Sequence, residues 1–399
     1  MQTPIYITPN LSYSLNKKKS KYPHVKLVEA LREYVSTKRT GDRLDNDKVI
    51  SARFGVSNVT VRAAMLDLVK EGRVIRRVGA GSFVTDPSIH QYIAIVIPQA
   101  ILSSQQDPFA KMAMVSILDA LNHNDLPYKL FMIPPIPGEE KWPTPPAFMR
   151  SGLTSAISKQ EIRALIHINI GLDCGDWAEP LERRNTPIVG VTTDACTPYR
   201  VSVTPERSIR QAVRYLSNFG RTRLALLSWN NRNSYSGGEP ETLRVFKEAL
   251  RESELIYYPE WARGDVNPND ESSAWRAFYD VWTASSDTKP DGLVITDDRL
   301  FSGVTSLLLE SNIKVPRDLQ IVTHWNKNSG ILCPFPVARY EIDPAKAGLM
   351  AAEMLQARLE NPDFPPTVKY VEPEWFTEGQ YDSLHDSSLP RLIRHSSPV

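Results

Sequence analysis

Two polar side chains in one short stretch have the chemistry and spacing needed to read a DNA groove. Asn58 and Arg62 are four residues apart, so on a helix they lie one turn apart on the same face. An Asn amide can pair bidentately with adenine, whereas a guanidinium binds guanine or a phosphate. The opposite face of residues 57–72 is apolar at helical spacing, with Val61, Ala64, Met65, Leu68 and Val69. The pattern predicts a helix with one face for a core and one for a groove.

A second group of candidate side chains follows short apolar runs that are typical of strands. In an open α/β sheet, ligands bind beyond the carboxyl ends of the strands, so these residues are candidates for a ligand site. They are Asp107, Phe109, Asn169, Asp194, Trp229, Arg232, Asp298, Trp325 and Asn326. Carboxylates and amides can bind sugar hydroxyls, and an indole can cover the apolar face of a sugar ring. This chemistry favours a sugar-like ligand.

Four of these candidates also have a purely structural alternative. Asp298 could cap the helix expected to begin there, a contribution of about 1 kcal/mol. Trp229 and Trp325 could be aromatics that pack inside a lobe, and Arg232 could be an ordinary loop charge. The sequence leaves these alternatives open.

The candidate groove-reading helix is preceded by two further helical patterns. Ser57 is placed as its N-cap and Gly72 as its C-terminal stop. A second helix is expected at about residues 47–54, joined to it by a tight turn. A first helix is expected to face the core through Val25, Val28, Leu31 and Val35.

Residues 73–84, RVIRRVGAGSFV, predict a two-stranded hairpin, or wing. Gly79 and Gly81 at its tip permit a close backbone approach to phosphate, and Arg76 and Arg77 supply charge. The glycines are not a dinucleotide fingerprint, because they lie inside a hairpin and Val84 occupies the third glycine position.

Charge is distributed unevenly along the 399 residues. Residues 1–86 hold 16 Lys and Arg against 8 Asp and Glu, a net charge of +8, although the whole chain carries only +1. A basic first part favours a polyanion as its partner. Residues 1–21 end in a lysine-rich run and are expected to form a mobile basic arm, either solvated or in contact with DNA phosphates.

Residues 24–84 resemble the winged helix-turn-helix head of the GntR family of bacterial transcription regulators. HVKLVEALREYV, GDRL, ARFGVSNVTVRAAMLDLVKEG and RRVGAGSFV occur in the family's order. Lys48 and Asn58 stand where family members usually have Arg, and Asn58 therefore implies an unusual operator sequence. The resemblance implies a DNA-binding set made of Lys48, Ser57, Asn58, Val59, Thr60, Arg62, Arg76, Arg77, Gly79 and Gly81.

From Tyr92 onward, short apolar runs alternate with helical segments, which predicts parallel sheets covered on both faces. Helices are expected at about residues 109–122, 205–218, 240–252, 271–284, 298–311 and 344–360. The proline-rich segment 134–146 predicts an ordered surface excursion.

Residues 91–380 resemble the ligand-binding core of LacI-type regulators, itself similar to periplasmic sugar-binding proteins. In ITDDRLFSGVTSLLLESNIKVPRDLQIVTHW, the family's spacing is kept by Asp298, Gly303 and Val315-Pro316. The resemblance implies two doubly wound lobes around a cleft, and a homodimer. Thr242 replaces the family's sugar-binding Arg, and Thr204-Pro205 replaces its Asp-Asn pair.

The expected fold class is α/β, with a small N-terminal winged helix-turn-helix (α+β) domain followed by a two-lobed, doubly wound, periplasmic-binding-protein-like domain. This combination is similar to regulators of the arabinose-repressor type. The expected divisions are an arm (1–21), a DNA-binding domain (22–86), a linker (87–91), a ligand-binding and dimerisation domain (92–381) and a C-terminal tail (382–399).

These features favour a ligand-responsive, sequence-specific DNA-binding regulator. We expect it to repress carbohydrate-use genes until a small sugar-like effector releases it from a double-stranded DNA operator. In the alternative, the body is a ligand-free dimerisation domain. An enzyme is a remote alternative, because the sequence has no nucleophile elbow or phosphate loop, and His167 is expected to be a strand residue rather than a base.

Cysteine usage and hydropathy favour a soluble cytoplasmic protein without membrane contact. Cys174, Cys196 and Cys333 are widely separated and form no CxxC pair, so we expect neither a metal site nor a disulfide framework, and no cofactor. No apolar run reaches the length of a membrane-spanning helix, and the N-terminus lacks the pattern of a signal peptide.

Overall fold

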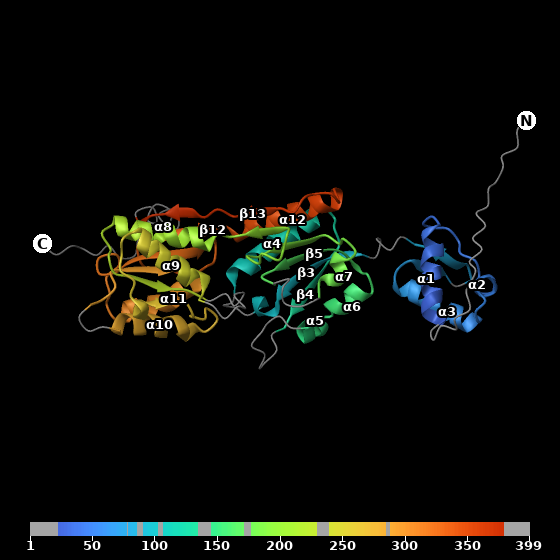
Figure 1. Ribbon diagram of the computed structural model, residues 1–399, viewed down its shortest axis with the longest axis horizontal. Helices are drawn as coiled ribbons and strands as arrows, with labels where there is room; N and C mark the ends of the chain where they lie inside the picture. Colours follow the sequence, from blue (N-terminus) through green and yellow to red (C-terminus); the bar gives the residue numbers. More distant parts are fainter. Residues whose placement is uncertain are drawn as a thin grey trace, which may run out of the picture. The chain divides into compact units, whose positions relative to one another are not determined.

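A computed structural model of the chain describes residues 23–77, 79–85, 91–102, 107–134, 145–170, 177–229, 239–284 and 288–378. The chain divides into two compact units, residues 1–91, here called the head, and residues 92–399, here called the body. The predicted arm, most of the predicted linker, the predicted tail and most of the proline-rich segment lie outside the described residues. Figure 1 labels the helices and strands of both units.

The head contains three helices and a two-stranded wing among its described residues. These are α1 (Pro23–Ser36), α2 (Asp47–Phe54), α3 (Asn58–Lys70), β1 (Val74–Arg77) and β2 (Gly81–Val84). The strands pair antiparallel, from Val74 opposite Val84 to Arg77 opposite Gly81. The predicted winged helix-turn-helix is confirmed.

A small apolar core holds the head together. Val61, Ala64, Met65 and Leu68 of α3 are fully buried, as their spacing predicts. The prediction for the first helix was wrong at Val25, which is 52% exposed, while Leu27 is buried. Leu27, Val28, Leu31 and Val35 form one stripe, and Val25 lies about 100° away from its centre.

The first lobe of the body is a six-stranded sheet in which all strands are parallel, in the order β13-β7-β6-β5-β3-β4. Its strands are β3 (Tyr92–Pro98), β4 (Tyr128–Ile133), β5 (Ile162–Ile168), β6 (Ile188–Val191), β7 (Arg200–Ser202) and β13 (Val368–Tyr370). Its helices are α4 (Pro108–His123), α5 (Pro145–Ser151), α6 (Leu153–Ser158), α7 (Glu179–Glu182) and α12 (Pro344–Glu360), with a 3-10 turn, η2 (Gln99–Leu102).

The second lobe repeats this plan in the order β14-β12-β11-β10-β8-β9, with the edge strand β14 antiparallel. Its strands are β8 (Leu224–Leu227), β9 (Ala262–Arg263), β10 (Gly292–Ile295), β11 (Gln320–Asn326), β12 (Ala338–Ile342) and β14 (Glu374–Phe376). Its helices are α8 (Pro205–Asn218), α9 (Glu241–Glu252), α10 (Glu271–Thr283) and α11 (Asp298–Glu310), with the 3-10 turn η3 (Pro259–Trp261).

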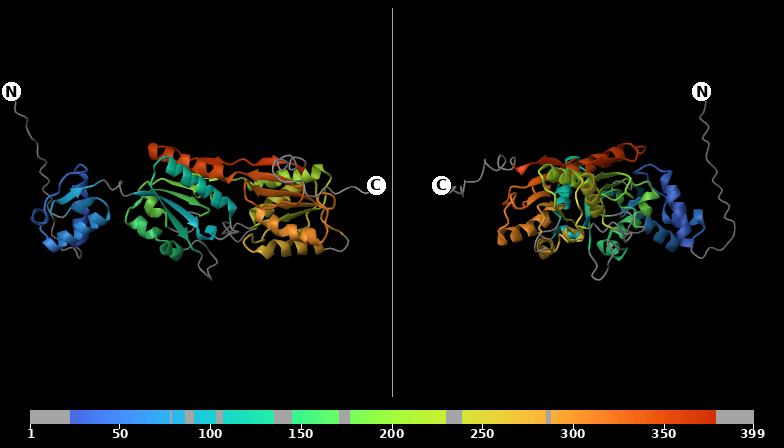
Figure 2. Two further views of the ribbon diagram at one scale, coloured as in Figure 1. Left: turned by 180° about the vertical axis from the view of Figure 1, so that it is seen from behind. Right: turned by 60° about the vertical axis from the view of Figure 1, so that its left-hand side comes forward.

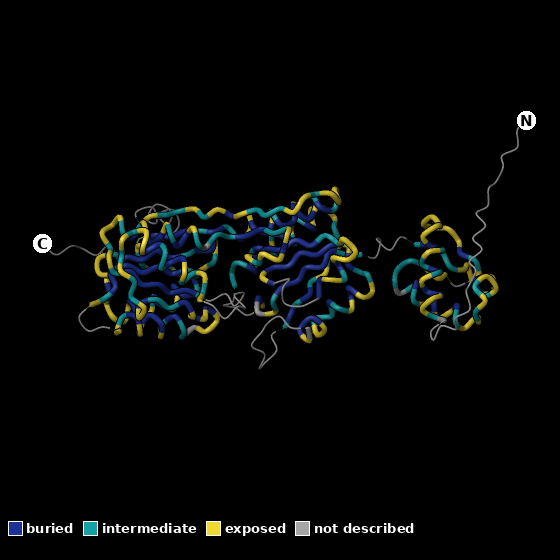
Figure 3. The backbone as a smooth tube through the Cα atoms, viewed as in Figure 1, coloured by how far each residue is buried: buried dark blue, intermediate teal, exposed yellow. Residues whose placement is uncertain are grey.

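The chain passes between the lobes more than once. After β12 in the second lobe, α12 returns to the first lobe and packs against α4, as Figures 1 and 2 show. Gly348 permits this close approach, because a Cβ at that position would lie 2.2 Å from the Ala113 carbonyl oxygen. The central strands of both sheets are buried in Figure 3, whereas the edge strands β9, β13 and β14 are not, in agreement with helices on both faces of parallel sheets.

Candidate DNA-binding face and interlobe site

The first turns of α3 present the predicted groove-reading side chains to solvent. Ser57 caps the helix by accepting a hydrogen bond from the backbone N–H of Thr60 at 3.2 Å, and the two hydroxyl oxygens lie 2.8 Å apart. Asn58 and Arg62 are exposed, and Val59 is 76% exposed. An amide, a guanidinium and an apolar side chain therefore stand together on one open helix face.

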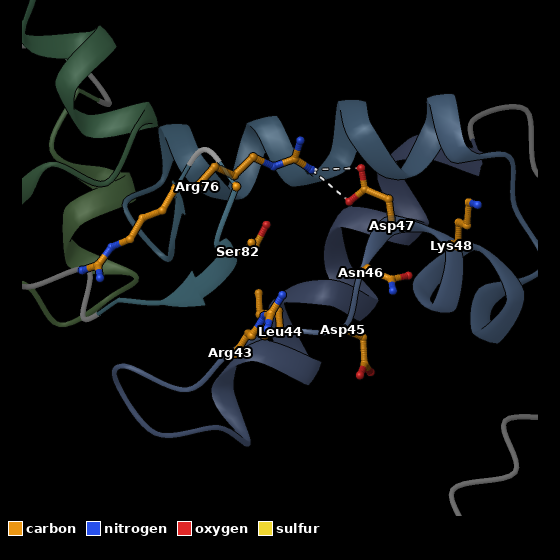
Figure 4. A pocket seen from close by; sticks show the side chains of 11 residues that line it. Arg43, Leu44, Asp45, Asn46, Asp47, Lys48, Arg76 and Ser82 are labelled. Carbon is orange, nitrogen blue, oxygen red and sulfur yellow. Dashed lines mark hydrogen bonds and ion pairs between the residues drawn. The ribbon is translucent and has the colours of Figure 1, made fainter.

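The wing and the start of α2 enclose a concavity of about 1010 Å³, drawn in Figure 4. Its lining includes five of the predicted DNA-binding residues: Lys48, Arg76, Arg77, Gly79 and Gly81. The structure adds residues that the sequence reasoning did not single out, namely Arg43, Leu44, Asp45, Asn46, Asp47 and Ser82. Five of these residues lie in GDRLDNDK, residues 41–48, on either side of and including Asn46, the N-cap of α2, and Ser82 lies in β2.

The wing glycines have the backbone conformation expected of hairpin-tip residues. Gly79 has φ +76° and Gly81 φ +110°, where a side chain would be strained. A Cβ on Gly81 would also lie 3.0 Å from Nε of Arg43. The Arg77 guanidinium lies 5.3 Å from the centre of the Phe83 ring, and this contact orients it.

One carboxylate contacts cations from two other elements of the head. Nη2 of Arg76 donates to Oδ1 of Asp47 at 3.1 Å, and Nε of Arg62 lies 3.6 Å from Oδ2 of the same residue. Asp47 belongs to α2, Arg62 to α3 and Arg76 to β1. The predicted DNA-binding arginines thus share an acidic neighbour.

In the first lobe of the body, Asp107 and Asn169 lie at the carboxyl ends of β3 and β5. Asp107 caps α4 by accepting from the Ala110 N–H at 2.9 Å, and Nδ2 of Asn169 donates to its other carboxylate oxygen at 2.9 Å. Both residues have positive φ, +49° for Asp107 and +53° for Asn169. The structure therefore brings two predicted ligand residues into direct contact.

The second lobe presents an ion pair that the sequence reasoning missed. Asp297 caps α11 and binds Arg299 through Nε at 2.9 Å and Nη2 at 2.6 Å. Their side chains are only 14% and 11% exposed. Burial opposes ionisation of Asp297, but the charge and hydrogen bonds of Arg299 outweigh burial and lower the pKa of Asp297.

Asp107 of the first lobe and Arg299 of the second lobe interact electrostatically. Burial raises the pKa of Asp107, and Arg299 opposes that rise. Nη1 of Arg299 also donates to Oδ1 of Asn269 at 3.0 Å, and its guanidinium lies 5.6 Å from the centre of the Trp229 ring. We call Asp107, Asn169, Trp229, Asp297 and Arg299 the interlobe site.

Asp298 and Asn326, two other predicted ligand residues, are buried and bound to each other. Asp298 accepts from the backbone N–H of Asn326 at 3.0 Å and from its Nδ2 at 3.1 Å. Burial first, and then the charge of Asp297, raise the pKa of Asp298 to about 7. The cap suggested for Asp298 is wrong, because Asp297 is the N-cap of α11.

Of the remaining predicted ligand residues, Trp325 is 6% exposed and packs edge-on against Phe301 in the core of the second lobe. Phe109 packs against the core of the first lobe. Both aromatic rings therefore pack against the cores of their lobes. Contact of either ring with a ligand stays a prediction.

The Asp194 carboxylate accepts a hydrogen bond from the backbone N–H of Cys196, in the same loop, at 2.9 Å. Nearby His167 is a buried residue of β5, and burial lowers its pKa to about 4. Arg232 lies outside the described residues.

The described ranges contain neither a cluster of side chains suited to a metal ion nor a helix long and apolar enough to cross a membrane.

Comparisons with known families match both units. The family of bacterial regulatory proteins called gntR matches residues 24–84, and the family of periplasmic binding protein-like domains matches residues 213–379. The chain therefore joins a head that matches the gntR family to a body that matches the family of periplasmic binding protein-like domains. Over 63 residues the chain is 43% identical to the HTH-type transcriptional regulator Rv0792c of Mycobacterium tuberculosis, and the match covers 15% of this chain and 23% of that protein.

Another relative of the chain is named a repressor. Over 140 residues the chain is 25% identical to the HTH-type transcriptional repressor PurR of Aliivibrio fischeri, covering 35% of this chain and 41% of the relative. The chain thus spans less than half the length of these curated relatives. They are transcription regulators rather than enzymes.

Solved structures share the fold of the body. The complex of the transcriptional regulator CelR with cellobiose has a TM-score of 0.58 at 15% identity, covering 84% of this chain and 99% of that chain. A LacI family transcriptional regulator from Lactobacillus casei with bound sucrose has a TM-score of 0.55 at 17% identity, covering 72% of this chain and 98% of that chain.

Proposed function

We propose that this protein is a transcription regulator whose head binds operator DNA and whose body binds a small, uncharged, sugar-like effector between its lobes. In this proposal it represses genes of carbohydrate use, and the effector releases it. Two copies joined through their bodies would place two heads on a two-fold-related operator. A coupling free energy of about 1–3 kcal/mol between effector and operator is sufficient for release.

The DNA-binding part is supported by the chemistry of the head. Arg62, Arg76, Arg77 and Lys48 supply positive charge on α3, the wing and α2, and cations of this kind bind phosphates. Asn58 and exposed Val59 stand at the start of α3, where an amide can pair with adenine and a methyl group can contact thymine. The same surface can therefore bind the backbone and read bases.

The charge balance of the interlobe site carries the effector part of the proposal. Arg299 is already neutralised by Asp297 through two side-chain hydrogen bonds, and Asp107 adds a carboxyl group whose pKa is raised by burial. An anionic ligand would meet carboxyl groups and an arginine that is already paired, whereas hydroxyl groups can bind carboxylate and amide oxygens. The half-buried Trp229 ring offers an apolar surface.

The solved relatives support the same ligand class, because the titles of two of them name bound cellobiose and sucrose. The relative PurR is named a repressor, which supports repression as the direction of control.

A direct test combines thermal shift with a gel shift on the full-length chain. Neutral mono- and disaccharides should raise the melting temperature, by an amount that grows with concentration, and sugar phosphates should not. The stabilising sugar should then release a duplex selected from a random library. Asn169→Ala should weaken the sugar effect without changing DNA affinity. Stabilisation by anions in place of neutral sugars would refute the ligand class.

A ligand-free body that only dimerises is the second candidate function. It is favoured by the commitment of Asp298, Asn326 and Trp325 to internal contacts. Under this alternative, no sugar alters the melting temperature or the affinity for the selected duplex, while sequence-specific DNA binding persists.

A further inference from the structure

Asp47 lies between two arginines that the proposed function assigns to DNA. Its Oδ1 accepts from Nη2 of Arg76 at 3.1 Å, and its Oδ2 lies 3.6 Å from Nε of Arg62. Figure 4 shows the Arg76 guanidinium directed at the Asp47 carboxylate across the concavity. One side chain of α2 thereby contacts the recognition helix α3 and the wing strand β1.

These contacts are open to exchange. The Arg62 side chain is 71% exposed and that of Arg76 34% exposed, while Asp47 is 28% exposed. Ion pairs in such positions are weak, because water competes for both partners. A DNA phosphate or a guanine edge can therefore take over either arginine.

We propose that Asp47 is a positioning residue that sets the sequence specificity of the head. Asp47 holds the side chains of Arg62 and Arg76 in one arrangement. Its negative charge repels any DNA phosphate that approaches without binding one of these arginines. Without Asp47, the two long side chains are free to reach any nearby phosphate, which favours binding to random sequence. A repulsive group of this kind lowers affinity for wrong partners more than for the right one. This inference rests on the proposed DNA-binding function.

The head offers a matched control in Asp45, which lines the same concavity. Asp45 accepts from the Tyr34 hydroxyl at 2.8 Å and lies 3.1 Å from Nη1 of Arg53. Asp45→Asn therefore removes one negative charge from the same concavity while the contacts of Asp47 with Arg62 and Arg76 are kept.

The test measures the affinity of the full-length chain for a duplex selected from a random library and for a scrambled duplex of equal length. Asp47→Asn should bind the scrambled duplex about three- to tenfold more tightly and lower the selected-to-scrambled ratio by a similar factor. Its plot of log affinity against log salt on scrambled DNA should steepen by about one, because a freed arginine displaces a further counterion. Asp47→Glu, which keeps the carboxylate, should restore most of the ratio.

Asp45→Asn should leave the selected-to-scrambled affinity ratio within about twofold of the wild type, because it frees neither Arg62 nor Arg76. An equal fall of the ratio in Asp45→Asn and Asp47→Asn would overturn the inference in favour of bulk charge. Weaker binding of Asp47→Asn to both duplexes, with a lower melting temperature, would overturn it in favour of a helix-end role. If the wild-type chain selects no sequence, the proposed function fails, whereas an unchanged ratio in Asp47→Asn refutes this inference alone.

Discussion

Each unit of the molecule contains a carboxylate at the start of a helix that binds arginine, and the two differ in burial. In the head, Asp47 in the first turn of α2 contacts Arg62 and Arg76, which are 71% and 34% exposed. In the body, Asp297 caps α11 and binds Arg299, and their side chains are 14% and 11% exposed. Both carboxylates benefit from the positive end of a helix dipole.

The difference in burial indicates how each surface recognises its partner. An exposed pair exchanges readily with solvent and with phosphate, so the arginines of the head stay available to DNA. A buried pair is fixed, because separating it strands a charge away from water. Under the proposed function, Arg299 therefore belongs to the wall of the interlobe site, and recognition of the effector would depend on hydrogen bonds and shape more than on net charge.

The largest expected effect is the loss of Arg299. Arg299→Ala leaves Asp297 and Asp107 without their nearest positive charge, and we expect the free energy of unfolding of the body to fall by about 3–5 kcal/mol. Urea denaturation of the full-length chain, followed by tryptophan fluorescence, measures this change. Arg76→Ala in the head should change stability by less than about 1 kcal/mol, because its pair is exposed.

A double variant checks the physical reason. Asp297→Leu combined with Arg299→Met removes both charges and should be less destabilising than Arg299→Ala alone, because no uncompensated charge remains. If Arg299→Ala proves no more destabilising than Arg76→Ala, the contrast between the two units is wrong.

The next effect is a pH dependence that burial gives to the body. The folded pKa of Asp298, about 7, lies above the ordinary value of 3.8, so the folded protein holds a proton that the unfolded chain releases. This group therefore lowers stability as pH rises from about 4 to 7. Asp298→Asn removes that loss, so its stability relative to the wild type should increase across this window, on the order of 2–4 kcal/mol.

His324, on strand β11, provides a control in which the pH dependence of stability has the opposite sign. Burial lowers its pKa to about 4, below the ordinary 6.5, so the unfolded chain binds a proton that the folded protein does not. Wild-type stability contributed by this group is lost as pH falls from about 6.5 to 4. His324→Gln should therefore gain relative stability toward low pH. Urea midpoints of both variants at pH 5 and pH 8 test the two signs, and parallel shifts would contradict them.

In the head, the expected effects concern DNA affinity. Asn58→Ala should lose about 1–3 kcal/mol of binding free energy at a single base position of the selected duplex, because only that position loses its bidentate partner. Arg62→Ala should weaken binding to all sequences and reduce the salt slope by about one if its contact is to phosphate. Competition binding with single-base variants separates the two. Equal losses on selected and scrambled DNA for Asn58→Ala would refute a reading role.

The sequence predicted the head well because its determinants are local. Ser57, the apolar stripe of α3 and the two wing glycines lie within about thirty residues, and each fixes its own backbone. The error at Val25 arose because two overlapping stripes of α1 fit helical spacing and only tertiary packing against α3 selects one.

The interlobe site was predicted less completely, because its members come from loops of two lobes. Asp107, Asn169 and Trp229 were found from their places after strands. Two consecutive aspartates stand at the start of α11, and the place after the strand and the family's spacing point to Asp298, whereas the structure makes Asp297 the N-cap. Arg299 was missed because its hydrogen bond with Asn269 and its electrostatic interaction with Asp107 depend on how separate loops fold together.

The smallest expected effect is the free energy of the exposed pair in the head. A double-mutant cycle of Asp47→Ala and Arg76→Ala should give a coupling to stability of about 0.2–1 kcal/mol, falling in high salt, because water and ions compete for both side chains. The equivalent cycle of Asp297→Ala and Arg299→Ala should give several-fold more and depend little on salt, because neither partner is open to ions. Equal coupling in both cycles would show that burial does not distinguish these pairs. The arginines of the head would then not be freely exchangeable, and DNA could recruit them only by breaking a strong contact.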